Sequence, residues 1–95
     1  MTASNAPAAL PALEARAAEL GFDMSSDPMV GALLAALAAS KPAGRMLELG
    51  TGAGVGAAWL LHGMDASASL LSIDTDEAVL TVARETLEAD PRVQF

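Results

Sequence analysis

The sequence contains no cysteine and only three aromatic residues, Phe22, Trp59 and Phe95. Without cysteine the chain cannot form a disulfide framework, a thiolate metal site or a cysteine nucleophile. Hydrophobic residues nevertheless make up 53% of the sequence, and alanine is the commonest of them. This composition indicates a helix-rich core of small side chains in which the helices pack closely.

Basic residues are scarce as well, with five Lys and Arg against twelve Asp and Glu and a net charge of -7. A negative chain repels a phosphate backbone, so we expect no nucleic-acid partner. Charged residues interrupt the alanine-rich start of the chain, and no apolar run reaches the ~18 residues of a membrane span. These absences predict a cytoplasmic protein without a membrane segment.

Two helices are predicted near the start of the chain, after a frayed segment at residues 1–7. The first helix begins at Ala8 and stops at Gly21, and its apolar stripe consists of Leu10, Leu13, Ala17 and Leu20. A second helix over residues 28–39 has Asp27 as its N-cap and Pro28 at its first position. Pro42 and Gly44 end it with a turn.

Three strand-like segments follow, RMLELG (45–50), SLLSID (69–74) and RVQF (92–95). Helix-forming segments separate them, one ending near Gly63 and the other capped by Thr75 or Asp76 and followed by Pro91. The order α-α-β-α-β-α-β predicts a parallel sheet with crossover helices in an α/β fold.

The stretch LELGTGAGVG (47–56) places four glycines behind the first of these strands. At the carboxyl edge of a parallel sheet, glycines let a ligand approach the backbone, and the next helix presents unpaired N–H groups to an anion. The alternative is a tight turn with spare glycines. Because a strand precedes the turn and a helix follows it, we favour a nucleotide-like cofactor.

Two carboxylates refine this prediction. Asp74, at the end of the second strand, can accept both hydroxyl protons of a ribose, although it can also serve as a helix cap or surface acid. Glu48 would repel a pyrophosphate but can hold a cation such as a methionyl amino group, unless it is an outward residue paired with Arg45. A dinucleotide fingerprint also fits Gly52, Gly54 and Ala57, so NAD or FAD stays open.

With these motifs, residues 23–95 resemble the first half of class I S-adenosylmethionine-dependent methyltransferases, most closely the bacterial relatives of catechol O-methyltransferase. The resemblance implies that residues 23–95 are the N-terminal half of a Rossmann-like S-adenosylmethionine-binding domain, preceded by an N-terminal helix in residues 1–22. It implies that backbone at Gly50, Thr51 and Gly52 lines the methionyl part of S-adenosylmethionine, with Glu48 beside that part. Asp74 then takes the ribose hydroxyls, with Thr75 next to them.

The resemblance also has departures. Val55 and Gly56 stand where many such enzymes have an aromatic residue and a serine, so a hydroxyl near the cofactor carboxylate is missing. The family's catalytic and metal-binding residues come from later strands, so no catalytic or metal-binding residue is assigned and this chain alone is expected to be inactive. The first strand, MLEL, would be left as a bare apolar edge, which favours a homo-oligomer or another partner.

The resemblance favours O-methyl transfer to a small molecule, with this chain supplying the cofactor-binding half. Two alternatives stay open, a non-catalytic oligomerising module with a vestigial motif and a NAD- or FAD-binding half-domain. His62 is expected to lie at the surface or to cap its helix, and Trp59 to lie in the core or an interface.

Overall fold

A computed structural model describes residues 5–95, and within them it confirms the predicted α/β fold. The elements are α1 (Leu10–Glu19), α2 (Pro28–Ala39), β1 (Arg45–Leu49), α3 (Val55–Gly63), β2 (Ser69–Ile73), α4 (Glu77–Leu87) and β3 (Val93–Gln94). Residues 1–4 of the predicted frayed start lie outside the described residues. Pro7 is buried, so the prediction of fraying is wrong at that position.

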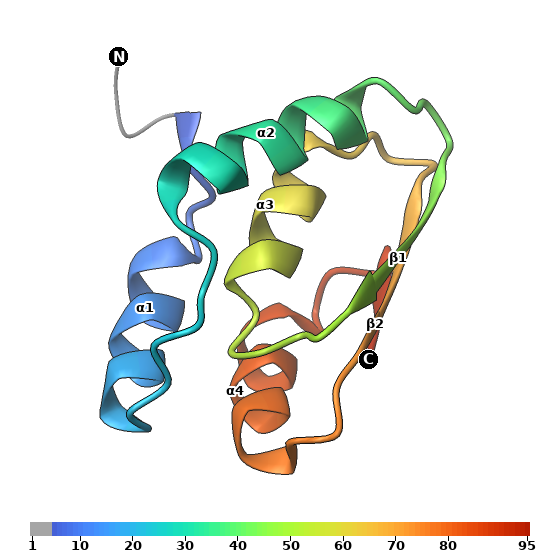
Figure 1. Ribbon diagram of the computed structural model, residues 1–95. Coiled ribbons are helices and arrows are strands. Elements are labelled where there is room, and N and C mark those ends of the chain that lie inside the picture. The colour runs from blue at the N-terminus through green and yellow to red at the C-terminus, as the bar shows by residue number, and fades with distance from the viewer. Residues whose placement is uncertain (1–4) are drawn as a thin grey trace.

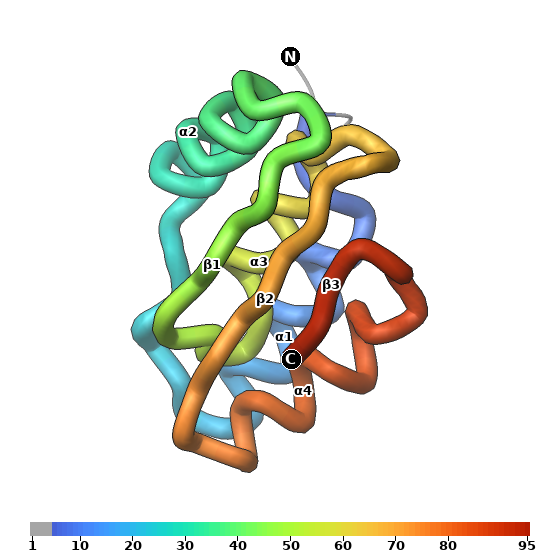
Figure 2. The backbone as a smooth tube through the Cα atoms, turned by 90° about the vertical axis from the view of Figure 1, so that its right-hand side faces the viewer, coloured from blue at the N-terminus to red at the C-terminus, as the bar shows by residue number. Residues whose placement is uncertain are grey.

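The three strands are parallel and lie in the order β1-β2-β3. In the β1–β2 pair Glu48 stands opposite Ser72. All four helices lie on one side of the sheet (Figure 1), and Figure 2 looks onto the uncovered side. Parallel sheets usually have both faces covered, so this open face is unusual for the fold.

Close packing of α2 on α3 follows from the small residues that the composition predicts. A Cβ at Gly63 would overlap the backbone carbonyl of Ala35, and a Cβ at Gly31 would overlap the indole of Trp59. Trp59 is 5% exposed and so belongs to the core, as predicted. The α2–α3 pair therefore depends on bare backbone at two contact points.

Helix α1 packs against α3 and α4, with Leu10, Leu13 and Ala17 buried as its apolar stripe predicts. Leu20 was predicted to belong to this buried stripe, but it is the C-cap residue of α1 and is 49% exposed. Gly21 turns the chain with φ +69°, and the N–H of Phe22 donates to the carbonyl of Ala17. Phe22 rather than Leu20 therefore packs against the core. The domain division at residue 22 stays a prediction.

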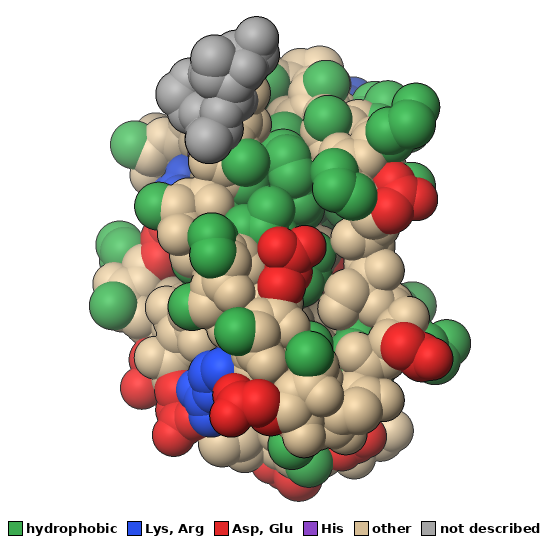
Figure 3. All heavy atoms as spheres, turned by 90° about the vertical axis from the view of Figure 1, so that its left-hand side faces the viewer, with side chains coloured by type: hydrophobic (Ala, Val, Ile, Leu, Met, Phe, Trp, Pro, Cys, Tyr) green, Lys and Arg blue, Asp and Glu red, His purple; other side chains and the backbone are tan. Residues whose placement is uncertain are grey.

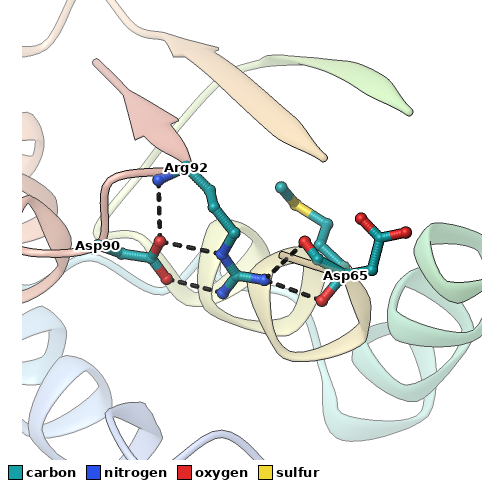
Figure 4. Close-up of polar contacts among 4 residues, drawn as sticks. Asp65, Asp90 and Arg92 are labelled. Atoms are coloured by element: carbon teal, nitrogen blue, oxygen red, sulfur yellow. Dashed lines mark hydrogen bonds and ion pairs between the residues drawn. The ribbon is translucent and has the colours of Figure 1, made fainter. Parts of the chain in front are cut away.

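An arginine fastens the start of β3 to the end of α3 (Figure 4). Arg92 Nη2 donates to Asp90 Oδ2 over 2.7 Å, and Arg92 Nη1 donates to the carbonyl of Met64 over 2.8 Å. The hydrogen bond from Arg92 holds the pKa of the Asp90 carboxyl below its usual range. The Arg92 side chain thus links the two-residue strand β3 to the end of α3 by charged hydrogen bonds.

On the face that carries α1, acidic side chains are more prominent than basic ones (Figure 3), in keeping with the net charge of -7. His62 is exposed in the last turn of α3, which agrees with the sequence prediction. No helix among the described residues is long and apolar enough to cross a membrane.

Candidate functional site

The glycine turn joins β1 to α3 at the carboxyl edge of the sheet. Gly50, Gly52 and Gly54 have φ angles of +93°, +55° and +104°, which side-chain-bearing residues rarely adopt. The N–H groups of Gly50 and Thr51 both donate to the carbonyl of Ile73, at 2.7 and 3.1 Å. The turn is therefore tied to β2, and alternate glycines there are a conformational requirement.

Helix α3 starts at this turn without a side-chain cap, because its N-cap residue is Gly54. The first backbone N–H to reach an intrahelical acceptor is that of Ala58, which donates to the carbonyl of Gly54. The preceding N–H groups and the positive end of the helix dipole lie beside the turn, an arrangement that suits an anionic group.

A hollow of about 260 Å³ opens beside the turn. Five of the six residues predicted from the sequence line it, namely Glu48, Gly50, Thr51, Gly52 and Asp74. The sixth, Thr75, is exposed and is not among the lining residues. The structure thus gathers side chains and bare backbone from β1, the glycine turn and the end of β2 in one place.

Glu48 faces the helix side of β1, as does half-buried Met46, while Arg45, Leu47 and Leu49 are exposed. Its Oε1 accepts a hydrogen bond of 2.6 Å from Ser72 Oγ. Within the described residues it forms no ion pair with Arg45, so the alternative of an outward, paired residue is wrong. Burial raises the pKa of Glu48, the Ser72 hydrogen bond opposes this, and Asp74 adds to the rise.

Asp74 braces the turn from the end of β2. Its Oδ2 accepts from the N–H of Gly52 over 2.8 Å, and its Oδ1 accepts from the N–H of Asp76 over 2.9 Å. These two backbone hydrogen bonds, the Asp76 bond first, hold its pKa below the usual range of aspartate. Asp74 is therefore ionised at neutral pH, and capping of α4 falls to Asp76, whose side chain accepts from Ala78.

Four further lining residues come from the segment between α1 and α2, namely Phe22, Met24, Ser25 and Ser26. The ring of Phe22 lies over Gly52, where a Cβ would stand 2.8 Å from its Cζ. Ser25 Oγ is buried without a hydrogen-bond partner. A buried unpaired hydroxyl is costly, which favours a polar ligand at this wall of the hollow.

Gly56 leaves room for the carboxylate of Glu48. A Cβ at position 56 would lie 2.5 Å from Glu48 Oε2 and 3.6 Å from Ser26 Oγ. Gly56 is also the position at which the chain lacks the serine hydroxyl of many similar enzymes. The Ser26 side chain brings a hydroxyl to the same place from a segment thirty residues earlier in the chain.

The hollow can hold a cation at Glu48, a hydroxylated group at Asp74 and an anionic group near the start of α3. Uncharged backbone lines the space between them. The described residues contain no group of three or more His, Asp or Glu side chains that could hold a metal ion. The charges and hydrogen-bonding groups of the hollow would suit a polar organic ligand of mixed charge.

A family described as protein-L-isoaspartate(D-aspartate) O-methyltransferase matches residues 7–94 of the chain. A proposed O-methyltransferase of Mycobacterium sp. (strain KMS) is 40% identical over an alignment that covers 78% of this chain. The same alignment covers 35% of that relative, so the chain spans about a third of its length.

Among solved structures, the O-methyltransferase TomG of Streptomyces achromogenes, involved in tomaymycin synthesis and solved with S-adenosylmethionine, superposes with a TM-score of 0.82. It is 25% identical, and the match covers 92% of this chain and 41% of TomG. A protein-L-isoaspartate O-methyltransferase superposes with a TM-score of 0.64 at 25% identity, covering 75% of this chain and 23% of that enzyme.

Proposed function

The chain belongs to the protein-L-isoaspartate(D-aspartate) O-methyltransferase family, within the class I S-adenosylmethionine-dependent methyltransferases, and from this premise we propose that the hollow beside its glycine turn binds S-adenosylmethionine. Residues 5–95 then form the cofactor-binding part of an O-methyltransferase. The observation that carries the proposal is the convergence of Glu48, the bare backbone of the turn and Asp74 on one hollow.

Each part of the hollow suits a part of the cofactor. The carboxylate of Glu48 would attract the methionyl ammonium group, and the N–H groups at the start of α3 would attract the methionyl carboxylate. Asp74, already ionised and fixed by two backbone N–H groups, would accept hydrogen bonds from the ribose hydroxyls. Ser25 and Ser26 would add hydroxyl contacts on the opposite wall.

The proposed role of these residues is to bind and orient the cofactor. When bound, S-adenosylmethionine would supply an electrophilic methyl group to an acceptor oxygen and leave as S-adenosylhomocysteine, and the proton of that oxygen would pass to solvent. Charge at Glu48 and hydrogen bonds at Asp74 would restrict the orientation of the cofactor and so favour its alignment with the acceptor oxygen.

We propose a small molecule as the methyl acceptor, although the family description names a protein isoaspartate. The enzyme of tomaymycin synthesis superposes on more of this chain, and with a higher TM-score, than the isoaspartate enzyme does. The chain spans about a third of the length of its Mycobacterium relative. Methyl transfer by a whole enzyme is therefore proposed here as well. A cytoplasmic location stays a prediction.

Thermal unfolding in the presence of two cofactors tests this function against a dinucleotide half-domain. S-Adenosylhomocysteine at about 100 times its Kd should stabilise the chain by about 2.7 kcal/mol, which raises Tm by roughly 10 °C or more for a domain of this size. NAD at the same concentration should leave Tm unchanged, because Glu48 repels its pyrophosphate. Protection by NAD alone would assign the hollow to dinucleotides.

The uncovered side of the sheet favours association as a second function. On this side Leu47, Leu49, Leu71 and Ile73 are 60%, 76%, 41% and 47% exposed, and β1 is an edge strand of the sheet that the described residues form. An apolar face next to free backbone N–H and C=O groups suits pairing with another sheet. We propose that a second copy of the chain covers it when no other partner does.

Sedimentation over a range of concentrations tests this association. The wild-type chain should change from monomer to dimer, and Leu47→Lys should stay monomeric because it places a charge in the apolar contact. Leu20→Lys is the matched control, since Leu20 is also an exposed leucine but lies on α1. Dimerisation of Leu47→Lys at the wild-type concentration would contradict an interface at this face.

A further inference from the structure

A chain of buried hydroxyl groups connects the glycine turn to Glu48. Thr51 Oγ1 and Ser72 Oγ are 2.7 Å apart, and Ser72 Oγ donates to Glu48 Oε1 over 2.6 Å. Ser72 is 0% exposed and Thr51 is 3% exposed, and among the described residues they are the only polar or charged ones that are buried as whole residues. Both hydroxyls are therefore placed out of water for a contact with each other and with the carboxylate.

The donor-to-acceptor direction of these hydrogen bonds depends on the charge of Glu48. An ionised carboxylate only accepts hydrogen bonds, so the proton of Ser72 must point to Glu48. Ser72 Oγ then accepts a hydrogen bond from Thr51 Oγ1. The two hydrogen bonds therefore run from Thr51 to Ser72 and from Ser72 to Glu48. A protonated Glu48 could instead donate to Ser72, which would turn both hydroxyls around.

The two oxygens of Glu48 have different surroundings. Oε1 is occupied by Ser72, whereas Oε2 lies over Gly56 and has no hydrogen-bond partner among the described residues. Glu48 and Gly56 both line the hollow. The Ser72 hydroxyl thus fixes Oε1 of Glu48 by a hydrogen bond and leaves Oε2 available to a ligand.

We propose that Ser72 and Thr51 are positioning residues that keep the carboxylate of Glu48 ionised and turned toward the hollow, where Oε2 receives the ammonium group of the cofactor. This inference rests on the proposed function. It deepens that function, because cofactor binding becomes dependent on pH through Ser72, which does not line the hollow.

The charges around Glu48 set the direction of that dependence. Burial and the carboxylate of Asp74 raise the pKa of Glu48, and the hydrogen bond from Ser72 lowers it. Lys41 lines an apolar groove with Glu48 between α2 and β1, but it forms no ion pair with Glu48 in the described residues. Helix α3 brings no charged side chain to the carboxylate, since His62 lies in its last turn.

Loss of the Ser72 hydroxyl should therefore raise the pKa of Glu48 further. As pH falls through this higher pKa, Glu48 becomes neutral and the attraction for an ammonium group is lost. Ser72→Ala should accordingly bind S-adenosylhomocysteine roughly tenfold more weakly than wild type at mildly acidic pH. The difference should shrink as pH rises, because Glu48 then ionises in both proteins.

Carboxyl carbon NMR of the chain tests this directly, with the Glu48 signal identified by its absence in Glu48→Gln. We expect the Glu48 titration to move to higher pH in Ser72→Ala, and to return in Ser72→Thr, which restores a hydroxyl. Ser69→Ala is the matched control, since Ser69 lies exposed on the same strand. If Ser72→Ala does not fold, Thr51→Val, which removes the donor behind Ser72, should move the titration in the same direction.

An unchanged Glu48 titration in Ser72→Ala, or in Thr51→Val if that variant is used, would overturn the inference. Calorimetric binding of S-adenosylhomocysteine across the same pH range gives a separate reading. If wild type failed to bind at any pH, the proposed cofactor function would be wrong. If wild type bound but Ser72→Ala gave the same pH profile, the positioning role alone would be wrong.

Discussion

Asp74→Ala is expected to weaken the binding of S-adenosylhomocysteine by ~1–3 kcal/mol, which is roughly 5-fold to 150-fold in Kd. Two losses add together. The variant lacks the carboxylate that would hold the ribose hydroxyls, and it also lacks the acceptor for the N–H of Gly52, so the turn that lines the hollow is less well fixed. Isothermal titration calorimetry of the two proteins measures the change.

Asp65→Ala is the matched control for this prediction. Asp65, like Asp74, accepts two backbone N–H groups, those of Ala43 and Ser67, but it does not line the hollow. Its replacement should lower the stability of the chain and leave the affinity of folded protein unchanged. Equal affinity in wild type, Asp74→Ala and Asp65→Ala would remove Asp74 from the site.

Gly63→Ala is expected to destabilise the chain by about 3 kcal/mol or more, a large share of the ~5–15 kcal/mol that holds a typical domain folded. In an ordinary helix this change would stabilise by up to ~1 kcal/mol. Here the added Cβ would overlap the backbone carbonyl of Ala35, which cannot rotate away as a flexible side chain would. Helices α2 and α3 would have to separate, which would disturb the packing around Trp59.

Urea unfolding followed by the fluorescence of Trp59, the single tryptophan, measures this loss. Gly21→Ala provides the comparison, because a Cβ there has open space around it and meets only the strain of φ +69°. That strain costs roughly 1–2 kcal/mol. A smaller loss in Gly63→Ala than in Gly21→Ala would show that α2 and α3 do not approach each other as closely as described.

The bounds of α2 were predicted correctly because local signals set them, and those of α1 and the strands differ by one or two residues. Asp27 and Pro28 mark the start of α2, and its capping hydrogen bonds to Met29 and Val30 are those that the sequence predicts. Leu20 was misassigned because its exposure depends on where the chain reverses at Gly21. Periodicity along the sequence does not contain that information.

The lining of the hollow was predictable where it follows strand ends. Glu48, the glycines and Asp74 all lie within a few residues of the carboxyl ends of β1 and β2, which a parallel sheet brings to one edge. Ser26 and Phe22 were missed because they reach the turn from a separate loop. Ser72 was missed because its partner depends on the register between two strands, which places it opposite Glu48.

Calorimetric titration of the chain with S-adenosylhomocysteine at neutral pH, with circular dichroism to show that the chain is folded, tests whether the hollow binds the cofactor. We expect saturable binding of one ligand per chain, because Glu48, the bare backbone of the glycine turn and Asp74 line one hollow. Absence of saturable binding by a folded chain would contradict this proposal, and the glycine turn would then be a structural connection between β1 and α3 without a cofactor.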